Sequence, residues 1–335
     1  MTEEDEERLR AAIEAYHVAA LAYVAVRLGL PERLAEGGVG AEVLAAELKL
    51  SEPHLSRCLR GFVSIGICEE LEDGRFALTE LGRSLRKGSP SRLGEKVAIV
   101  VGQYWLPWAE LLATLETGRP AFEQVFGMTV AAWRRANKEE GALYSTYLAE
   151  ENFDQAADVI EAIDFGGVRT VAQIGGGYGG LIAAVLNAHP HLDGILFSPP
   201  HVAEAAADFL AKHGVAERVR RVGGDVRQEI PVEADLYLVK GLLQQWDDAG
   251  AAAILRNCRK AMPPHAKLLV IERLMPERAS DDPTAVMLDL HMMTITGGRA
   301  RSVAEFEALL RQAGLLLAGV RTTRAKLSIL EATRA

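Results

Sequence analysis

The sequence predicts a doubly wound α/β domain that follows a smaller, mainly α-helical domain. Three observations predict this fold. Apolar strands alternate with helical segments from Val168 onward, a glycine-rich loop follows the first strand, and the first 90 residues show helical periodicity interrupted by one hairpin. A chain of 335 residues is long enough for two domains. We therefore expect domains at 1–90 and 166–335, joined by a helical segment at 91–165.

The first 90 residues read as helices followed by a hairpin. Apolar residues recur at helical spacing from Leu9 to Leu28, and two shorter helices are expected at 40–48 and 51–65, the second with Ser51 as its N-cap. Strands at 67–71 and 75–79 flank the turn Asp73-Gly74. This order predicts a winged-helix domain. Because Leu9–Leu28 is broadly apolar, we expect it to pack against a partner subunit in a homodimer.

Charge argues against the DNA binding that many winged helices perform. The net charge of the chain is −9. Between residues 51 and 87, the basic side chains are balanced by an equal number of acids, namely Arg57, Arg60, Arg75, Arg83, Arg86 and Lys87 against Glu52, Glu69, Glu70, Glu72, Asp73 and Glu80. A surface that neutralises phosphates should carry excess positive charge. We expect dimerisation and no nucleic-acid partner.

The N-terminus and the cysteines predict a cytoplasmic protein. The start Thr2–Glu7 is acidic, whereas a signal peptide starts with basic residues. By inspection, no apolar run reaches the roughly 20 residues that span a bilayer, so we expect no membrane partner. Cys58, Cys68 and Cys258 show no metal or redox spacing and suit a reducing compartment. No metal site is expected.

Aromatic residues gather in the segment 91–165. Tyr104, Trp105 and Trp108 are expected to wall an apolar substrate pocket together with Tyr144 and Tyr147. Packing within the protein core is the alternative for these side chains.

The α/β domain is predicted element by element. The expected strands lie around Val171, Ile195 and Val219 and at 236–239 and 268–271; the expected helices lie at 202–212, 251–262 and 303–313. The segments 319–322 and 327–331 are expected to pair as an antiparallel hairpin at the sheet edge.

The loop after the first strand satisfies a weak nucleotide-binding pattern. Gly175, Gly177 and Gly180 match G-x-G-x-x-G between the apolar strand 170–174 and a helix expected from Tyr178 to Ala188. Sites of this kind place a carboxylate on the ribose hydroxyls at the carboxyl end of the second strand. The residue there is Ser198, while Asp193 lies at the opposite end of that strand. The loop is present, but its acidic partner is absent.

The ordered motifs of the chain resemble those of a known family. Over nearly its whole length the chain resembles the S-adenosylmethionine-dependent small-molecule O-methyltransferases of bacterial and plant secondary metabolism. The resemblance rests on 175–180, Ser198–Val202, Gly224-Asp225, Leu238–Asp248, Ala261–Pro264, Leu269–Glu272 and Gly297–Ser302. It implies a Rossmann-like class I methyltransferase domain behind a winged-helix dimerisation domain, with an aromatic or polyketide-like small molecule as substrate.

The resemblance also implies roles for individual residues. Gly175 and Gly177 would accommodate the methionine part of S-adenosylmethionine, Ser198 would face its ribose, and Asp225 would lie near its adenine. Lys240 and Trp246 would lie beside the cofactor. Glu272 matches an acid near the catalytic base. His291, Met287 and Met292 belong to a segment that lines the substrate pocket in the family.

The chain departs from the family pattern in four places, one of which is a pair of residues. Gln173 and Ser198 replace acids, Gln244-Gln245 replaces the His-Asp pair, and Ala300 replaces a Glu. Attack by a phenol or enol oxygen requires its deprotonation, and glutamine does not accept a proton near pH 7. Losing a general base typically costs about 10²–10⁴-fold in rate. Because Ser198 supplies no carboxylate to the ribose, S-adenosylmethionine is a possible but doubtful cofactor.

Three functions remain open. The first is a secondary-metabolite tailoring enzyme, of the kind found in antibiotic biosynthesis, that cyclises, rearranges or decarboxylates its substrate without methylation. Gln244 and Gln245 would then donate hydrogen bonds to a substrate carbonyl, and His291 would be a candidate acid or base, or simply a packed histidine. The second is an O-methyltransferase whose substrate arrives ionised. The third is a silent dimer partner of an active relative. A dehydrogenase is less favoured, because the ribose acid is missing for NAD as well.

Overall fold

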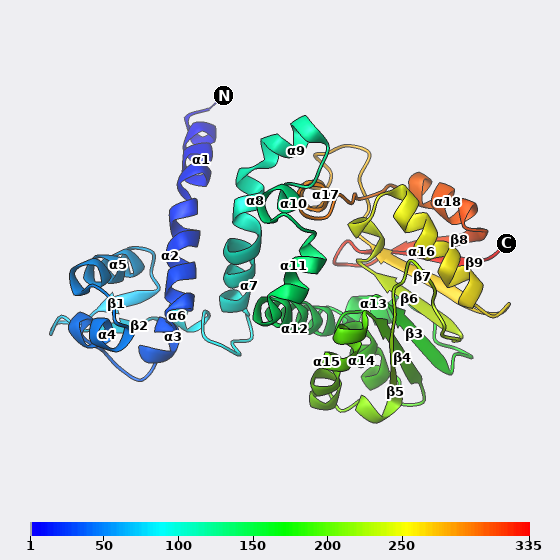
Figure 1. The fold of residues 1–335 in the computed structure, drawn as a ribbon, viewed down its shortest axis with the longest axis horizontal. Helices are drawn as coiled ribbons and strands as arrows, with labels where there is room; N and C mark the ends of the chain where they lie inside the picture. Colours follow the sequence, from blue (N-terminus) through cyan, green and yellow to red (C-terminus); the bar gives the residue numbers. More distant parts are fainter. Residues whose placement is uncertain (1) are drawn as a thin grey trace. The chain divides into compact units, whose positions relative to one another are not determined.

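The computed structural model describes residues 2–335 and divides into two compact units (Figure 1). The first unit ends at Ala109, and the second is Glu110–Ala335. The division falls inside the segment 91–165 that the sequence sets apart.

The first unit is helical apart from one short hairpin. Strands β1 (Cys68–Glu70) and β2 (Phe76–Leu78) pair antiparallel, which confirms the predicted hairpin. The helices are α1 (Glu3–Glu14), α2 (Tyr16–Arg27), α3 (Leu30–Arg33), α4 (Ala41–Leu48), α5 (Glu52–Ser64), α6 (Glu80–Arg83), α7 (Leu93–Ile99), the π-helical turn η1 (Val100–Tyr104) and α8 (Trp105–Ala109). The winged-helix order is confirmed.

Two local predictions in this unit had different outcomes: the start of the first helix was wrong, and the N-cap at Ser51 is confirmed. The helix expected from Leu9 begins at Glu3, because Thr2 and Asp5 form a capping box in which the Thr2 hydroxyl accepts from the Asp5 N–H at 3.2 Å. Ser51 does occupy the N-cap of α5. However, its hydroxyl bonds to Nδ1 of His54 at 2.8 Å and makes no bond to a backbone N–H.

The helices α1 and α2 expose an apolar surface. The exposed fractions of Leu9, Ile13 and Tyr16 are 63%, 65% and 53%. By length and hydropathy alone, the helical stretch Glu3–Arg27 qualifies as a candidate membrane span, because an 18-residue window within it has a mean hydropathy of 1.3. The expectation that no segment is long and apolar enough was therefore wrong. A soluble helix with a broad apolar face passes the same test of length and hydropathy.

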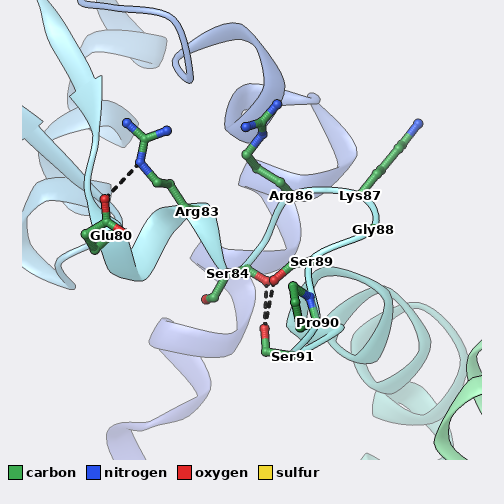
Figure 2. A pocket seen from close by; sticks show the side chains of 9 residues that line it. All are labelled: Glu80, Arg83, Ser84, Arg86, Lys87, Gly88, Ser89, Pro90 and Ser91. Atoms are coloured by element: carbon green, nitrogen blue, oxygen red, sulfur yellow. Dashed lines mark hydrogen bonds and ion pairs between the residues drawn. The ribbon is translucent and has the colours of Figure 1, made fainter. Parts of the chain in front are cut away.

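A hollow of about 590 Å³ lies along α6 and the loop that leads to α7 (Figure 2). It is lined by Glu80, Arg83, Ser84, Arg86, Lys87, Gly88, Ser89, Pro90 and Ser91. Three of these residues are basic, but Arg83 pairs with Glu80 at 3.2 Å. The backbone N–H of Lys87 donates to Glu32 at 2.9 Å. Acids therefore accompany the basic side chains here, as the charge balance of the sequence indicates.

The second unit is built on a seven-stranded sheet of order β5-β4-β3-β6-β7-β9-β8. Five strands run parallel, and β9 pairs antiparallel with both β7 and β8. The strands are β3 (Thr170–Ile174), β4 (Asp193–Ser198), β5 (Val219–Gly223), β6 (Leu236–Lys240), β7 (Lys267–Glu272), β8 (Leu315–Thr322) and β9 (Ser328–Arg334). All five predicted parallel strands and the terminal hairpin are confirmed.

The helices of this unit include three that match the predicted ones. These are α15 (Pro200–Lys212), α16 (Asp248–Ala261) and α18 (Val303–Gln312). The remaining helical elements are α9 (Leu111–Thr117), α10 (Ala121–Phe126), α11 (Val130–Ala136), α12 (Lys138–Asp154), α13 (Ala157–Glu161), α14 (Gly180–Ala188), η2 (Ala216–Arg218), η3 (Leu243–Gln245) and α17 (Pro283–Ile295).

Two apolar cores lie on the two faces of the sheet. Leu236 and Leu238 of β6 pack with Leu181 of α14, whereas the alternate residue Tyr237 packs in the core that contains residues of α16 and α18. The period of two in a strand sends successive side chains to opposite faces, so a strand covered on both sides is continuously apolar. Figure 1 shows α14 and α15 on one face and α16 and α18 on the other. The domain is doubly wound.

The glycine loop delays the start of α14. The helix was expected from Tyr178 but begins at Gly180. Gly175, Gly177 and Gly179 have positive φ of 68°, 59° and 89°, and these angles keep the loop out of helical geometry.

Candidate functional site

The candidate residues meet at one edge of the sheet. Gly175 follows β3, Ser198 ends β4, Lys240 ends β6, and Glu272 ends β7. These four strands are parallel neighbours, so their carboxyl ends share one edge. The strand order reverses direction between β3 and β6, which is where open α/β sheets bind ligands.

The glycine loop combines a tightly packed residue with an open one. A Cβ on Gly175 would lie 2.8 Å from the side chain of Leu242, so that position is closed to larger residues. At Gly177 a Cβ would meet nothing within 4 Å. The backbone at Gly177 is therefore free to approach a ligand, as the sequence predicts for a cofactor loop.

Gln173 and Ser198 support this loop from inside the protein. Oε1 of the buried Gln173 accepts from the N–H of Ile182 at 2.9 Å, in the first turn of α14. The Ser198 hydroxyl, which is fully buried, donates to the carbonyl of Gly177 at 3.1 Å. Neutral side chains thus hold the loop at two positions where acids were expected.

Asp225 is engaged by an arginine that the sequence analysis missed. Arg227 donates through Nε and Nη2 to the two Asp225 oxygens, at 3.2 and 3.0 Å. The hydrogen bond from Arg227 lowers the pKa of Asp225. The Arg227 guanidinium also lies 4.8 Å from the centre of the Trp246 ring. The spacing Asp225-Val-Arg227 was the available signal, since an Asp at a turn commonly bonds two residues ahead.

Among residues 2–335, the side-chain nitrogen of Lys240 has a hydrogen-bond partner, whereas that of Trp246 has none. Nζ of Lys240 donates to Oδ1 of Asn152 on α12, and burial lowers the pKa of Lys240. Nε1 of Trp246 is buried and has no hydrogen-bond partner among residues 2–335.

The turn η3 carries the two glutamines in place of the family's His-Asp pair. Nε2 of Gln245 donates to the carbonyl of Gly241 at 2.8 Å, so this amide is tied to its own turn. No hydrogen bond of the Gln244 side chain is found within the described chain, 2–335. Of the two glutamines, Gln244 has the amide that is available to a substrate.

Glu272 forms hydrogen bonds with the backbone of this turn. Its side chain is 2% exposed, and Oε1 accepts from the backbone N–H groups of Leu243 at 3.0 Å and Gln244 at 3.4 Å. Oε2 is buried and has no partner among residues 2–335. Burial raises the pKa of Glu272 to about 7, against the opposing effects of the two backbone donors and of Lys240 and Arg301.

The segment 297–301 packs against the same turn. Arg301 is fully buried and donates to the carbonyls of Leu243 at 3.0 Å and Trp246 at 2.8 Å. A Cβ on Gly298 would lie 2.1 Å from the carbonyl oxygen of Gln244, so the two backbones are in close contact. The structure thus brings the altered positions 244 and 300 to one place.

The sequence analysis also missed Asp289, an acid that accepts a hydrogen bond from Ala300. The buried Ala300 donates its backbone N–H to Oδ1 of Asp289 on α17, at 2.7 Å. Asp289 precedes His291 by two residues, and no sequence signal separated it from a solvated helix residue.

His291 lies on α17 beside Arg134 of α11. Burial, followed by the positive charge of Arg134, lowers the pKa of His291 to about 4. The imidazole is therefore neutral near pH 7, and its lowered pKa makes it a weak base that suits hydrogen bonding better than proton transfer. On the same helix, Met292 is buried and Met287 is 53% exposed.

The predicted aromatic wall is divided between the two units. Tyr104, Trp105 and Trp108 belong to the first unit, and Tyr144 and Tyr147 lie on α12 of the second. Arg134 lies over the Tyr144 ring, 3.3 Å from its centre. A shared pocket lined by these five side chains stays a prediction. Residues 2–335 contain no group of three or more His, Cys, Asp or Glu side chains arranged to hold a metal ion.

Residues 108–316 match the family model of the O-methyltransferase domain. The phenazine O-methyltransferase PhzM of Lysobacter antibioticus is 38% identical over 96% of this chain and 94% of its own length. The aclacinomycin 10-hydroxylase RdmB of Streptomyces purpurascens is 34% identical over 85% of this chain and 78% of its own length.

Solved structures agree with these sequence relatives. The crystal structure of LaPhzM superposes with a TM-score of 0.91 at 37% identity and covers 98% of this chain and 99% of its own. The O-methyltransferase NcsB1 from neocarzinostatin biosynthesis, solved with S-adenosylmethionine and 2-hydroxy-5-methyl naphthoic acid, has a TM-score of 0.82 at 29% identity and covers 97% of this chain and 98% of its own. The chain therefore belongs to the family of S-adenosylmethionine-dependent small-molecule O-methyltransferases.

Proposed function

We propose that this chain is a natural-product tailoring enzyme that acts on a hydroxylated aromatic or polyketide-like substrate without transferring a methyl group. The observation that carries the proposal is the state of the turn η3. Glu272 and Arg301 hold this turn in place, yet it presents the amide of Gln244 where the family has its general base. The turn that carries the general base in the family is present, but the base itself is replaced by Gln244.

The site lacks the carboxylates that hold S-adenosylmethionine in the family, so its residues fit this cofactor poorly. The open backbone at Gly177 suits the cofactor. Ser198, however, is fully buried and already bonded to Gly177, and it supplies no carboxylate for the ribose. Both oxygens of Asp225 are engaged by Arg227. Exchanging a charge-assisted hydrogen bond for a neutral one loses about half of its strength.

The remaining groups suit polarisation and positioning. The amide of Gln244 can donate to a substrate carbonyl, and the neutral His291 can form a hydrogen bond. Cyclisation, rearrangement or decarboxylation of an activated aromatic ring needs a fixed geometry and a hydrogen-bond donor more than a strong base.

The relatives support the substrate class and the change of reaction. NcsB1 was solved with naphthoic acids, and other relatives are named for phenazine and mitomycin. The relative named as a hydroxylase is evidence that the scaffold serves reactions other than methylation.

Methyl transfer to a substrate that arrives ionised is the second candidate. The names of most relatives favour it, and an ionised phenolate needs no general base. The cofactor would then have to bind without a ribose carboxylate.

We further propose a homodimer formed through α1 and α2, in the cytoplasm. The exposed apolar side chains of these helices support the dimer. A catalytically silent partner of an active relative would use the same surface.

Calorimetry with S-adenosylmethionine and S-adenosylhomocysteine tests the proposal. We expect binding at least tenfold weaker than that of the double variant Gln173→Asp, Ser198→Asp, which restores acids at the two loop positions. Calorimetry with 1,4-dihydroxy-2-naphthoic acid, one of the ligands solved with NcsB1, tests the substrate class. Tight cofactor binding by the unaltered chain, together with methylation of this naphthoic acid, would decide for the second candidate.

A further inference from the structure

A buried carboxyl group lies beside the turn that lacks its base. Glu272 ends β7 at the ligand-binding edge of the sheet, and Oε1 is used by the N–H groups of Leu243 and Gln244. Oε2 has no partner in residues 2–335, although it is buried. A buried polar atom without a partner costs about 1–3 kcal/mol. Such an atom is a candidate for contact with a bound molecule.

We propose that Glu272 exchanges a proton with the bound aromatic substrate through Oε2 and so supplies the acid–base group that Gln244 cannot. The inference rests on the proposed function and names the residue that moves the proton. The Gln244 side chain makes no hydrogen bond within residues 2–335 and belongs to the turn whose backbone bonds to Glu272.

The surroundings of Glu272 suit a carboxyl group that carries a proton near neutrality. Two cations act on it, Lys240 from β6 and Arg301 from the segment before α18. Nζ of Lys240 donates to Asn152. The guanidinium of Arg301 donates to the carbonyls of Leu243 and Trp246 and to the carboxylate of Asp248. Neither Lys240 nor Arg301 forms an ion pair with Glu272 within residues 2–335. Burial therefore dominates and raises the pKa of Glu272 to about 7.

The proton exchange balances without any further reactant, and the decarboxylation consumes one proton from water. The Oε2–H bond breaks, its electron pair stays on the carboxylate, and the proton forms a bond to an electron-rich ring carbon. The carboxylate then removes a proton from that carbon, which restores both partners. If the carbon carries a carboxylate, carbon dioxide leaves instead, and a proton from water restores Glu272.

Glu272→Gln separates proton exchange from support of the turn. The amide oxygen of glutamine still accepts from Leu243 and Gln244, but the side chain has no proton to exchange. The control is Glu331→Gln, which removes a carboxylate from the neighbouring strand β9, where Glu331 pairs with Lys267 and Arg321.

The first measurement is unfolding of the unaltered chain and of Glu272→Gln between pH 4 and 8. A raised pKa stabilises the fold fully below pH 4.5, and this contribution is lost as the pH rises to about 7. The folding equilibrium constant of the unaltered chain should therefore fall by about two powers of ten relative to the variant across this window. Parallel curves would overturn the proposal.

The second measurement follows deuterium from D₂O into ring carbon 3 of 1,4-dihydroxy-2-naphthoic acid by NMR. We expect exchange with the unaltered chain and with Glu331→Gln, and at least a 100-fold loss in Glu272→Gln at unchanged affinity for this acid. Equal exchange in Glu272→Gln, or binding without exchange in the unaltered chain, would overturn the role of Glu272 alone. Failure of the acid to bind would overturn the proposed function, and this inference with it.

Discussion

Glu272 and Arg301 hold the same turn by opposite groups of its backbone. Glu272 accepts from the N–H groups of Leu243 and Gln244, and Arg301 donates to the carbonyls of Leu243 and Trp246. The turn between β6 and α16 is therefore positioned by two buried charged side chains from elsewhere in the domain. All of these bonds go to backbone groups of the turn, so they do not require a particular side chain at position 244.

Arg301→Ala should destabilise the protein strongly. It leaves the Trp246 carbonyl without its Arg301 donor and removes one of the two donors to the Leu243 carbonyl, and a buried acceptor left unpaired costs about 1–3 kcal/mol. We expect a loss of about 3 kcal/mol in the free energy of unfolding, measured by urea denaturation. The control is Arg311→Ala, whose exposed i,i+4 pair with Glu307 is worth no more than about 0.5 kcal/mol. Similar losses in the two variants would contradict the structural role of Arg301.

The glycine loop should respond very differently at two of its positions. A Cβ at Gly180 would lie 1.9 Å from the carbonyl oxygen of Ala149 on α12, so Gly180→Ala forces two helices apart. Gly177 faces open space, and alanine there meets only the cost of a positive φ, roughly 1 kcal/mol. We expect Gly180→Ala to lower the melting temperature by several degrees more than Gly177→Ala. The reverse order would show that the loop is packed differently.

Periodicity and motif order predicted most of the fold because, in the α/β domain, the local sequence pattern of each strand agrees with its place in the sheet. Strands such as 236–240 are apolar along their whole length, and a strand covered by helices on both faces must be so. The start of α14 was missed by two residues, since only the backbone angles of three neighbouring glycines determine it.

The site was predictable in position but not in its contacts. The motifs placed Gln244 and Ala300 around one cleft, and in the structure the neighbours of Ala300, Gly298 and Arg301, contact the turn that carries Gln244. The engagement of Asp225 by Arg227 and of Ala300 by Asp289 depends on side-chain geometry that no spacing encodes. Glu272 was recognised only as an acid near the base; its unpartnered Oε2 follows from burial, which the sequence does not show.

His291 should make the protein sensitive to acid. Its pKa is lowered from 6.5 to about 4, so the unfolded chain binds a proton that the folded chain does not across this range. Stability should therefore fall as the pH drops from 6.5 to 4, by about 2–3 kcal/mol for this group. His291→Gln should flatten that part of the stability curve, and Arg134→Gln should raise the midpoint of the His291 NMR titration. A His291 signal that titrates near 6.5 in the unaltered chain would refute the burial argument.

The apolar face of α1 and α2 should determine the oligomeric state. Leu9 and Ile13 are 63% and 65% exposed, and lysine at both positions would place two charges in the proposed dimer interface. We expect the double variant Leu9→Lys, Ile13→Lys to be monomeric in light scattering at concentrations where the unaltered chain is dimeric. Its melting curve for the second unit should be unchanged, because these residues contribute nothing to either core of that unit. The control is Leu316→Lys on the edge strand β8, where Leu316 is 51% exposed and outside the proposed interface. Dissociation by the β8 variant with an intact dimer in the α1 variant would move the interface to the sheet edge.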